Sequence, residues 1–206
     1  MAAATPACWL ADYPPRQRNQ LLDYLFEPGY GASLQTLKLE IGGDTYSTDG
    51  AEPSVEHTKG VVDCDNGYEW WLAEQAKARN PHIGFYGLAW GAPGWIDNGS
   101  GNFWTQDTID YLMSWLGCAA KHQLTVDYIG GWNERGYDKA WYEHLKAALV
   151  SHGYGATKIV AADSDWSVAD AMAAVSARDD DQHARLRHAA RNRAGRCPTC
   201  RVGGDG

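Results

Sequence analysis

Short apolar runs that alternate with longer amphipathic stretches constrain the fold of this chain more than any other feature of its sequence. The apolar runs, each followed by glycine or polar residues, cover residues 37–41, 83–88, 126–129 and 158–162. The amphipathic stretches cover residues 16–26, 69–79, 108–120 and 140–150. The short runs predict buried strands, and apolar residues at helical spacing predict helices. A helix followed by repeated strand–helix pairs predicts parallel strands joined by right-handed crossovers.

Two architectures fit this order of elements, a (β/α)8 barrel and an open parallel sheet. The chain has 206 residues, whereas a complete barrel typically needs about 250. In both architectures the ligand site lies at the carboxyl ends of the strands. The residues that directly follow each apolar run are therefore the first candidates for a functional site.

The C-terminal segment 172–206 differs in composition from the rest of the chain. It contains seven arginines but no lysine and no aromatic residue. Such a segment buries too little apolar surface to offset its chain entropy, so we expect it to be disordered or out of frame. The alternative is a basic arm that binds an anionic partner. The folded domain is expected to span residues 12–171.

Charge and hydropathy exclude several classes of protein. The formal net charge of −8 disfavours nonspecific binding to nucleic acid. No run approaches the ~20 apolar residues of a membrane-spanning helix, so we expect no transmembrane segment. Residues 1–8 lack the basic start and apolar core of a secretory signal. The sequence assigns neither a compartment nor an oligomeric state.

The five cysteines do not predict a disulfide scaffold. They are widely spaced, and their odd number leaves at least one unpaired. We interpret them as buried or idle thiols. Cys197 and Cys200 form a CxxC pair, but a zinc site needs a second ligand pair at suitable spacing, which the sequence lacks. No metal site is predicted.

Polar and aromatic residues gather directly after the predicted strands. The loop GGDTYSTDG follows the first strand, Trp90 follows the second, WNER at 132–135 ends the third and DSDW at 163–166 ends the fourth. Indole rings cover the apolar C–H face of a sugar, while carboxylates and amides bind its hydroxyls. This pattern predicts a carbohydrate site, although any single tryptophan also fits a core and GGD also fits a tight turn.

The pair Asn133-Glu134 gives the sharpest chemical indication. An Asn-Glu pair directly after the fourth barrel strand is typical of retaining glycosidases with this architecture. There the glutamate protonates the leaving oxygen, and the asparagine binds the 2-hydroxyl, a contact that strengthens in the oxocarbenium-like transition state. The alternative is a helix cap or a surface turn.

Five segments, read in order, carry a family resemblance. They are LLDYLFEPGYGASLQTLKLEIGGDTYSTDGAEPS, GYEWWLAEQAKARNPHI, GLAWGAPGW, VDYIGGWNERGYD and KIVAADSDW. With them the chain resembles glycoside hydrolase family 59, the galactocerebrosidase family, over most of residues 13–166. The resemblance implies a partial (β/α)8 TIM barrel of about four βα units. It also implies a retaining exo-β-galactosidase that needs no cofactor or metal and acts on a β-galactoside such as a galactosylceramide-like glycolipid.

The resemblance assigns roles to individual residues. Glu134 matches the acid/base of the family and Asn133 its sugar-binding neighbour. Thr48 matches a threonine that binds a galactose hydroxyl, and Trp90 matches a tryptophan that lines the pocket. Gly43 and Asp44 are expected to shape the same rim. Family members are typically lysosomal or secreted, and a related barrel glycosidase acting on glucosides or plant galactans is the remaining alternative.

The chain also departs from the family pattern. It lacks the glycine-rich first strand and the seventh-strand Ser-Glu that carries the nucleophile. Retaining hydrolysis requires two carboxyl groups about 5–5.5 Å apart. Glu143 and Asp163 are the other carboxylates at hand, and neither matches the nucleophile position. We therefore expect an impaired enzyme, with an inactive fragment that binds sugar weakly as the alternative.

Overall fold

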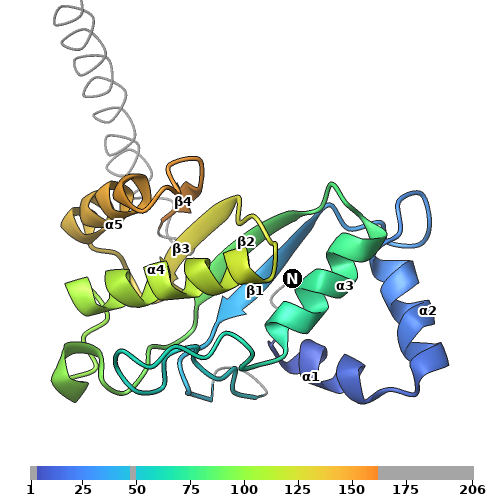
Figure 1. Cartoon of the computed structure of the whole chain (residues 1–206), viewed down its shortest axis with the longest axis horizontal. Helices are drawn as coiled ribbons and strands as arrows, with labels where there is room; N and C mark the ends of the chain where they lie inside the picture. The colour runs from blue at the N-terminus through green and yellow to red at the C-terminus, as the bar shows by residue number, and fades with distance from the viewer. Residues whose placement is uncertain (1–3, 47–49, 162–206) are drawn as a thin grey trace, which may run out of the picture. The chain divides into compact units, whose positions relative to one another are not determined.

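The computed structural model of the chain describes residues 4–46 and 50–161. These residues form an α/β fold around a single parallel sheet (Figure 1). The strands are β1 (Thr36–Ile41), β2 (Gly84–Ala89), β3 (Tyr128–Trp132) and β4 (Lys158–Val160). They lie in the order β1-β2-β3-β4, and each strand pairs in parallel with the next. Sequential parallel neighbours are the arrangement expected for part of a (β/α)8 barrel.

Two helices precede β1, and three occupy the connections between the strands. They are α1 (Ala4–Asp12) and α2 (Pro15–Phe26), then α3 (Glu69–Arg79), α4 (Gln106–Lys121) and α5 (Lys139–Ser151), with a 3-10 turn η1 (Ile96–Gly99) before α4. Helix α3 has the predicted bounds, while α2, α4 and α5 each extend one or two residues beyond theirs. Helix α1 was not predicted. In the described part of the chain, no helix is both long enough and apolar enough to cross a bilayer.

The two faces of β1 carry different chemistry. Leu37, Leu39 and Ile41 are buried on the face covered by helices. Because side chains alternate along a strand, Lys38 and Glu40 point to the other face, which is the inner face of the partial barrel. A polar pair on the inner face of an otherwise apolar strand marks the side on which a functional site can form.

Helix α4 packs closely against the helix-covered face of the sheet, and Figure 1 shows it lying in front of the strands. A Cβ atom added at Gly87 in β2 would lie 2.8 Å from the ring of Trp115 in α4. Trp115 itself is almost fully buried. The glycine therefore gives the indole ring room to lie directly on the strand.

Strand β3 differs from its prediction at both ends, and two glycines explain the difference at its C-terminal end. It begins at Tyr128 rather than at residue 126, and it continues through Gly130 and Gly131 to Trp132. Glycine is unfavourable in strands in isolation. Here a Cβ at Gly130 would lie 2.3 Å from Leu88, and one at Gly131 would lie 2.7 Å from the hydroxyl of Tyr142. Close packing from both faces therefore requires these glycines and overrides their low strand propensity.

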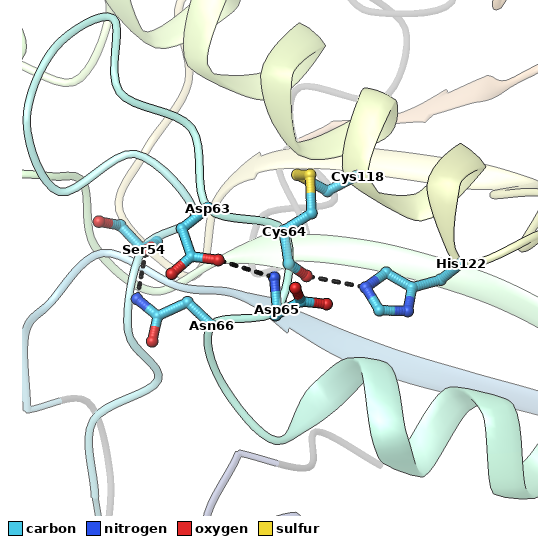
Figure 2. The surroundings of a disulfide bond; sticks show 7 residues. All are labelled: Ser54, Asp63, Cys64, Asp65, Asn66, Cys118 and His122. Atoms are coloured by element: carbon cyan, nitrogen blue, oxygen red, sulfur yellow. Dashed lines mark hydrogen bonds between the residues drawn. A yellow bond between two sulfur atoms is a disulfide. The ribbon is translucent and has the colours of Figure 1, made fainter.

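A disulfide bond connects the loop before α3 with helix α4. It joins Cys64 to Cys118 across 54 positions of sequence (Figure 2). The side chain of His122, directly after α4, lies beside the bond, with Nε2 2.7 Å from the carbonyl oxygen of Cys64. The interpretation of these two cysteines as idle thiols is therefore wrong. Cys8 is a free thiol.

Candidate active site

The ends of β2 and β3 are fixed to each other by two hydrogen bonds. The backbone N–H of Asn133 donates to the carbonyl oxygen of Ala89 at 2.8 Å, which continues the sheet ladder beyond β3. The indole N–H of Trp132 donates to the carbonyl oxygen of Trp90 at 3.1 Å. The predicted motif residues Trp90 and Asn133 are thus held at the same edge of the sheet, where a barrel places its ligand site.

Glu134 follows directly in an uncommon backbone conformation. Its φ angle is +54°, in the left-handed region that non-glycine residues rarely adopt. Its side chain is exposed. Strained backbone conformations of this kind concentrate at functional sites. The carboxylate predicted to be the acid/base thus projects at the strand end and not within a helix or the core.

Lys38 brings β1 into this arrangement. Its ammonium nitrogen lies 3.5 Å from Oδ1 of Asn133 and 4.6 Å from the ring centroid of Trp90. It also lies 5.4 Å from the ring centroid of Tyr86. Sequence reasoning missed Lys38. The available signal was a charged residue in the middle of an otherwise apolar strand.

An open cleft of about 410 Å³ lies beside these residues. Trp90 and Trp132 contribute to its wall together with Arg135, whose guanidinium lies 5.4 Å from the ring centroid of Trp132. The remaining lining residues are Thr45, Tyr46, Gly91, Ala92, Pro93, Gly94, Ile96, Gly99, Gly101, Asn102 and Phe103. Asn133 and Glu134 adjoin this cleft in sequence but are not part of its lining. Aromatic faces beside a cationic and an amide side chain suit a ligand with both apolar and hydroxylated surfaces.

Gly43 determines how the loop after β1 packs against the loop after β2. A Cβ at Gly43 would lie 2.4 Å from the carbonyl carbon of Gly91 and 2.5 Å from the backbone nitrogen of Ala92. A Cβ at Gly91 would lie 2.0 Å from the hydroxyl oxygen of Thr45. The two loops therefore touch backbone to backbone. This is a structural reason for the glycine predicted at the rim.

Asp44, the second predicted rim residue, stabilises its own loop through its side-chain contacts with Ser54 and His57. Its carboxylate accepts hydrogen bonds from the backbone N–H of Ser54 at 2.8 Å and from the Ser54 hydroxyl at 2.6 Å, and it lies 3.1 Å from Nδ1 of His57. Burial alone would raise the pKa of Asp44, but the hydrogen bonds from Ser54 and His57 outweigh it and lower the pKa. Thr48 belongs to the loop that Asp44 closes, but it lies outside the described residues, as does Asp163.

Three buried glutamates, one of them within this loop, were also missed by sequence reasoning. Glu40, Glu52 and Glu69 are each less than a tenth exposed. One carboxylate oxygen of Glu52 accepts from the backbone N–H groups of Tyr68 at 3.1 Å and of Glu69 at 3.4 Å, at the N-terminus of α3. Burial raises the pKa of Glu52 to about 8 and that of Glu69 well above its usual range. Residues 4–46 and 50–161 contain no group of three His, Cys, Asp or Glu side chains placed to hold a metal ion.

Taken together, parallel strands in sequential order and an Asn-Glu pair at a strand end define a partial barrel of the glycosidase type. The sequence model of Glycosyl hydrolase family 59 matches residues 1–189. The chain belongs to glycoside hydrolase family 59, as the resemblance predicted.

Curated relatives of the chain are galactocerebrosidases. The protein from Danio rerio is 46% identical over 166 residues, which make up 79% of this chain and 25% of that protein. The protein from Homo sapiens is 46% identical over 162 residues, 76% of this chain and 23% of that protein. A putative galactocerebrosidase from Caenorhabditis elegans is 37% identical over 145 residues, 70% of this chain and 22% of that protein. The chain thus spans about a quarter of the length of these relatives.

Solved structures support the fold. An endo-beta1,6-glucanase matches with a TM-score of 0.58 and 20% identity, covering 76% of this chain and 42% of that one. The catalytic domain of GH30 xylanase C from Talaromyces cellulolyticus matches with a TM-score of 0.63 and 22% identity, covering 86% of this chain and 49% of that one. At these identities the likeness shows the architecture alone. The predicted α/β class and partial (β/α)8 barrel are confirmed.

Proposed function

We propose that the chain forms the acid/base side of a retaining β-galactosidase site for galactosylceramide-like glycolipids. The observation that carries the proposal is the placement of Asn133 and Glu134 directly after β3, with Asn133 hydrogen-bonded to the end of β2. Trp90 lies at the same edge, where its carbonyl accepts from Trp132. The name galactocerebrosidase, which the relatives carry, supports galactose as the sugar.

Each residue has a defined part in the proposed reaction. Glu134 donates its proton to the glycosidic oxygen as the bond from C1 of the sugar to the aglycone breaks and C1 bonds to the second carboxylate that a retaining site requires. Glu134 then takes a proton from the water that displaces this carboxylate and releases the sugar. Asn133 binds the 2-hydroxyl, a contact that strengthens as positive charge develops on the ring. Trp90 covers an apolar face of the sugar. Thr48 is assigned to a further galactose hydroxyl, and Gly43 and Asp44 are assigned to the rim of the same site.

A second candidate function is sugar binding without turnover. A retaining enzyme needs a second carboxylate about 5–5.5 Å from the first to form the glycosyl-enzyme. Of the two further carboxylates considered from the sequence, Glu143 lies within α5, in the helical layer and not at a strand end. This position favours a partial site that holds galactose but does not hydrolyse its bond.

Release of the aglycone from an aryl β-galactoside tests the proposed hydrolysis. Hydrolysis by this chain would be seen as turnover that falls roughly 10²–10⁴-fold in Glu134→Gln, the usual contribution of a general acid. Glu143→Gln serves as the matched control, because it makes the same chemical change in a helix of the same domain. Wild-type turnover no higher than that of Glu134→Gln would contradict hydrolysis by this chain.

The identity of the sugar is tested by comparing the hydrolysis of two substrates and by measuring sugar binding. Faster hydrolysis of an aryl β-glucoside than of the galactoside would contradict the assignment of galactose. If neither substrate is turned over, hydrolysis by this chain is contradicted. An NMR titration with methyl β-galactoside then tests the second candidate function, sugar binding without turnover. Chemical shift changes at the Trp90 indole would then support the binding site, and their absence would reject both functions.

A further inference from the structure

We propose that Lys38 is a positioning residue that orients Asn133 and Trp90 toward the sugar. The proposal rests on the function proposed above, because it concerns the same site. Trp90 lines the cleft, while Asn133 adjoins it in sequence and Lys38 lies on a different strand. Lys38 reaches the two side chains from the middle of β1, and it therefore acts on the ligand through them.

The placement of Lys38 within the sheet is specific. It lies opposite Tyr86 in the β1–β2 register, on the inner face of the partial barrel. Its neighbours Leu37 and Leu39 point to the opposite face and are buried. Lys38 itself is half-buried. Withdrawing an ammonium group from water is costly unless polar or aromatic groups surround it. The half-buried position of Lys38 therefore depends on the amide and aromatic side chains around its ammonium group.

The charge of Lys38 determines which way the Asn133 amide faces. A lysine ammonium carries three donors and no acceptor, so only the oxygen end of an amide can face it favourably. Oδ1 of Asn133 lies 3.5 Å from the ammonium nitrogen. The backbone of Asn133 is held separately by its hydrogen bond to Ala89. Because the backbone and the amide oxygen of Asn133 are both held, its NH2 group is presented as a donor on the side away from Lys38.

The same ammonium holds the indole of Trp90. It lies 4.6 Å from the ring centroid, within the range in which the ring's negative face attracts a cation. The carbonyl of Trp90 is fixed by Trp132. Lys38 is thus the common contact of the two predicted sugar-binding side chains, one from the end of β2 and one from the end of β3.

This geometry specifies how the sugar is recognised. Asn133 donates to a sugar oxygen, so the 2-hydroxyl accepts from the amide and keeps its own proton for another acceptor. Loss of the Lys38 charge releases the amide to rotate and weakens this contact. A 2-deoxy sugar lacks the oxygen and is insensitive to the loss of this amide contact, although it still senses the Trp90 ring.

The variant Lys38→Met tests the inference, because it keeps an unbranched stem and removes the charge. Lys77→Met is the matched control. Lys77 lies in α3, is also half-buried and has its ammonium 6.0 Å from the ring centroid of Phe85. Both variants exchange a lysine over an aromatic ring for methionine, but Lys77 lies in the helical layer. Dispersed amide spectra of both variants report that the chain is folded.

The first readout needs no sugar. In 15N-labelled full chain, the side-chain NH2 signal of Asn133 is identified by its loss in Asn133→Ser, and the indole N–H of Trp90 by its loss in Trp90→Phe. We expect both signals to shift in Lys38→Met and to stay in place in Lys77→Met. An Asn133 signal that does not move in Lys38→Met would overturn the proposal.

The second readout is affinity for methyl β-galactoside and for its 2-deoxy analogue. We expect roughly tenfold weaker binding of the galactoside by Lys38→Met, the usual effect of losing a hydrogen bond to a charged group. The 2-deoxy analogue keeps the Trp90 contact but lacks the Asn133 contact, so its binding should weaken less. Equal losses for both sugars would indicate a general structural effect and overturn the positioning role. If the wild type binds neither sugar, the proposed function fails and the sugar-orienting role fails with it, while the amide signals still decide whether Lys38 orients Asn133.

Discussion

The carboxylate of Glu52 accepts a hydrogen bond from the backbone N–H of Glu69, and the side chain of Glu69 is itself buried beside it. Two neighbouring buried carboxyl groups both resist ionisation, because burial disfavours each charge and each charge disfavours the other. Glu52 offsets part of this cost by accepting from two backbone N–H groups at the start of α3. The fold therefore keeps protons on carboxyl groups that lose them in the unfolded chain.

This arrangement predicts that the domain is more stable in acid than in mild alkali. The pKa of Glu52 is raised from 4.5 to about 8 by burial. The folded state thus binds more protons than the unfolded state between these values, and the stability contributed is full below pH 4.5 and lost as pH rises through 8. The loss approaches about 1.4 kcal/mol per pH unit for one proton. Chemical denaturation at pH 5, 7 and 9 measures it.

Glu52→Gln should flatten this pH dependence, because the glutamine oxygen still accepts from α3 but the side chain stays neutral. Glu56→Gln is the matched control. Glu56 is also buried, and its carboxylate accepts from the backbone N–H of Gly60 at 2.6 Å. A Glu52→Gln profile as steep as that of the wild type would show that another group governs the alkaline loss.

The disulfide leads to a second prediction, which concerns the stability of the fold. The bond between Cys64 and Cys118 closes a loop of 54 positions. Closing a loop of this length restricts the unfolded chain, so removing the bond is expected to cost about 2–4 kcal/mol. Urea denaturation of Cys64→Ser, compared with wild type in the presence and absence of a reductant, measures the difference.

Cys8→Ser provides the control for this experiment, because Cys8 is a free thiol. We expect it to behave like the wild type under both conditions. We also expect the reductant to lower the stability of the wild type but not that of Cys64→Ser. A reductant effect of equal size in Cys64→Ser would contradict the pairing.

Helices α2 to α5 and their alternation with the strands were accessible from the sequence, whereas α1 was not. The bounds of α3 were predicted because its apolar residues repeat at helical spacing and the chain is punctuated on both sides. The end of β3 was less accessible. Gly130 and Gly131 have low strand propensity, and only the close approach of Leu88 and Tyr142 explains why the strand continues through them.

Interactions between distant residues were not accessible in the same way. Nothing in the spacing of Cys64 and Cys118 distinguishes a bonded pair from two idle thiols, because the fold brings them together. Glu52 and Glu69 likewise read as ordinary surface residues until the loop folds onto α3. The strand-end rule drew attention to Asn133 and Trp90, which directly follow β3 and β2, but it did not reveal Lys38, which lies in the middle of β1.

The last prediction concerns the loop that contains Thr48. Asp44 closes this loop through Ser54 and His57 and adopts a left-handed backbone conformation, with φ at +57°. Because hydrogen bonds lower the pKa of Asp44, its stabilisation is present above the unfolded value of 3.8 and is lost as pH falls through the lower folded value. Asp44→Asn should therefore destabilise the domain at pH 7 by about 1–3 kcal/mol.

A double-mutant cycle with Ser54→Ala separates the stabilisation that comes from the Asp44–Ser54 hydrogen bonds from the effect of losing the Asp44 charge. Asp44 and Ser54 share two hydrogen bonds, so the two substitutions together should cost less than the sum of their separate costs. The asparagine keeps one oxygen that accepts from the Ser54 backbone, and the remaining loss therefore falls mainly on the hydroxyl contact. Strict additivity in urea denaturation would show that Asp44 acts independently of Ser54. If the loop that Asp44 and Ser54 close contributes to the sugar site, Asp44→Asn should also weaken binding of methyl β-galactoside, and Ser54→Ala should weaken it to a smaller extent.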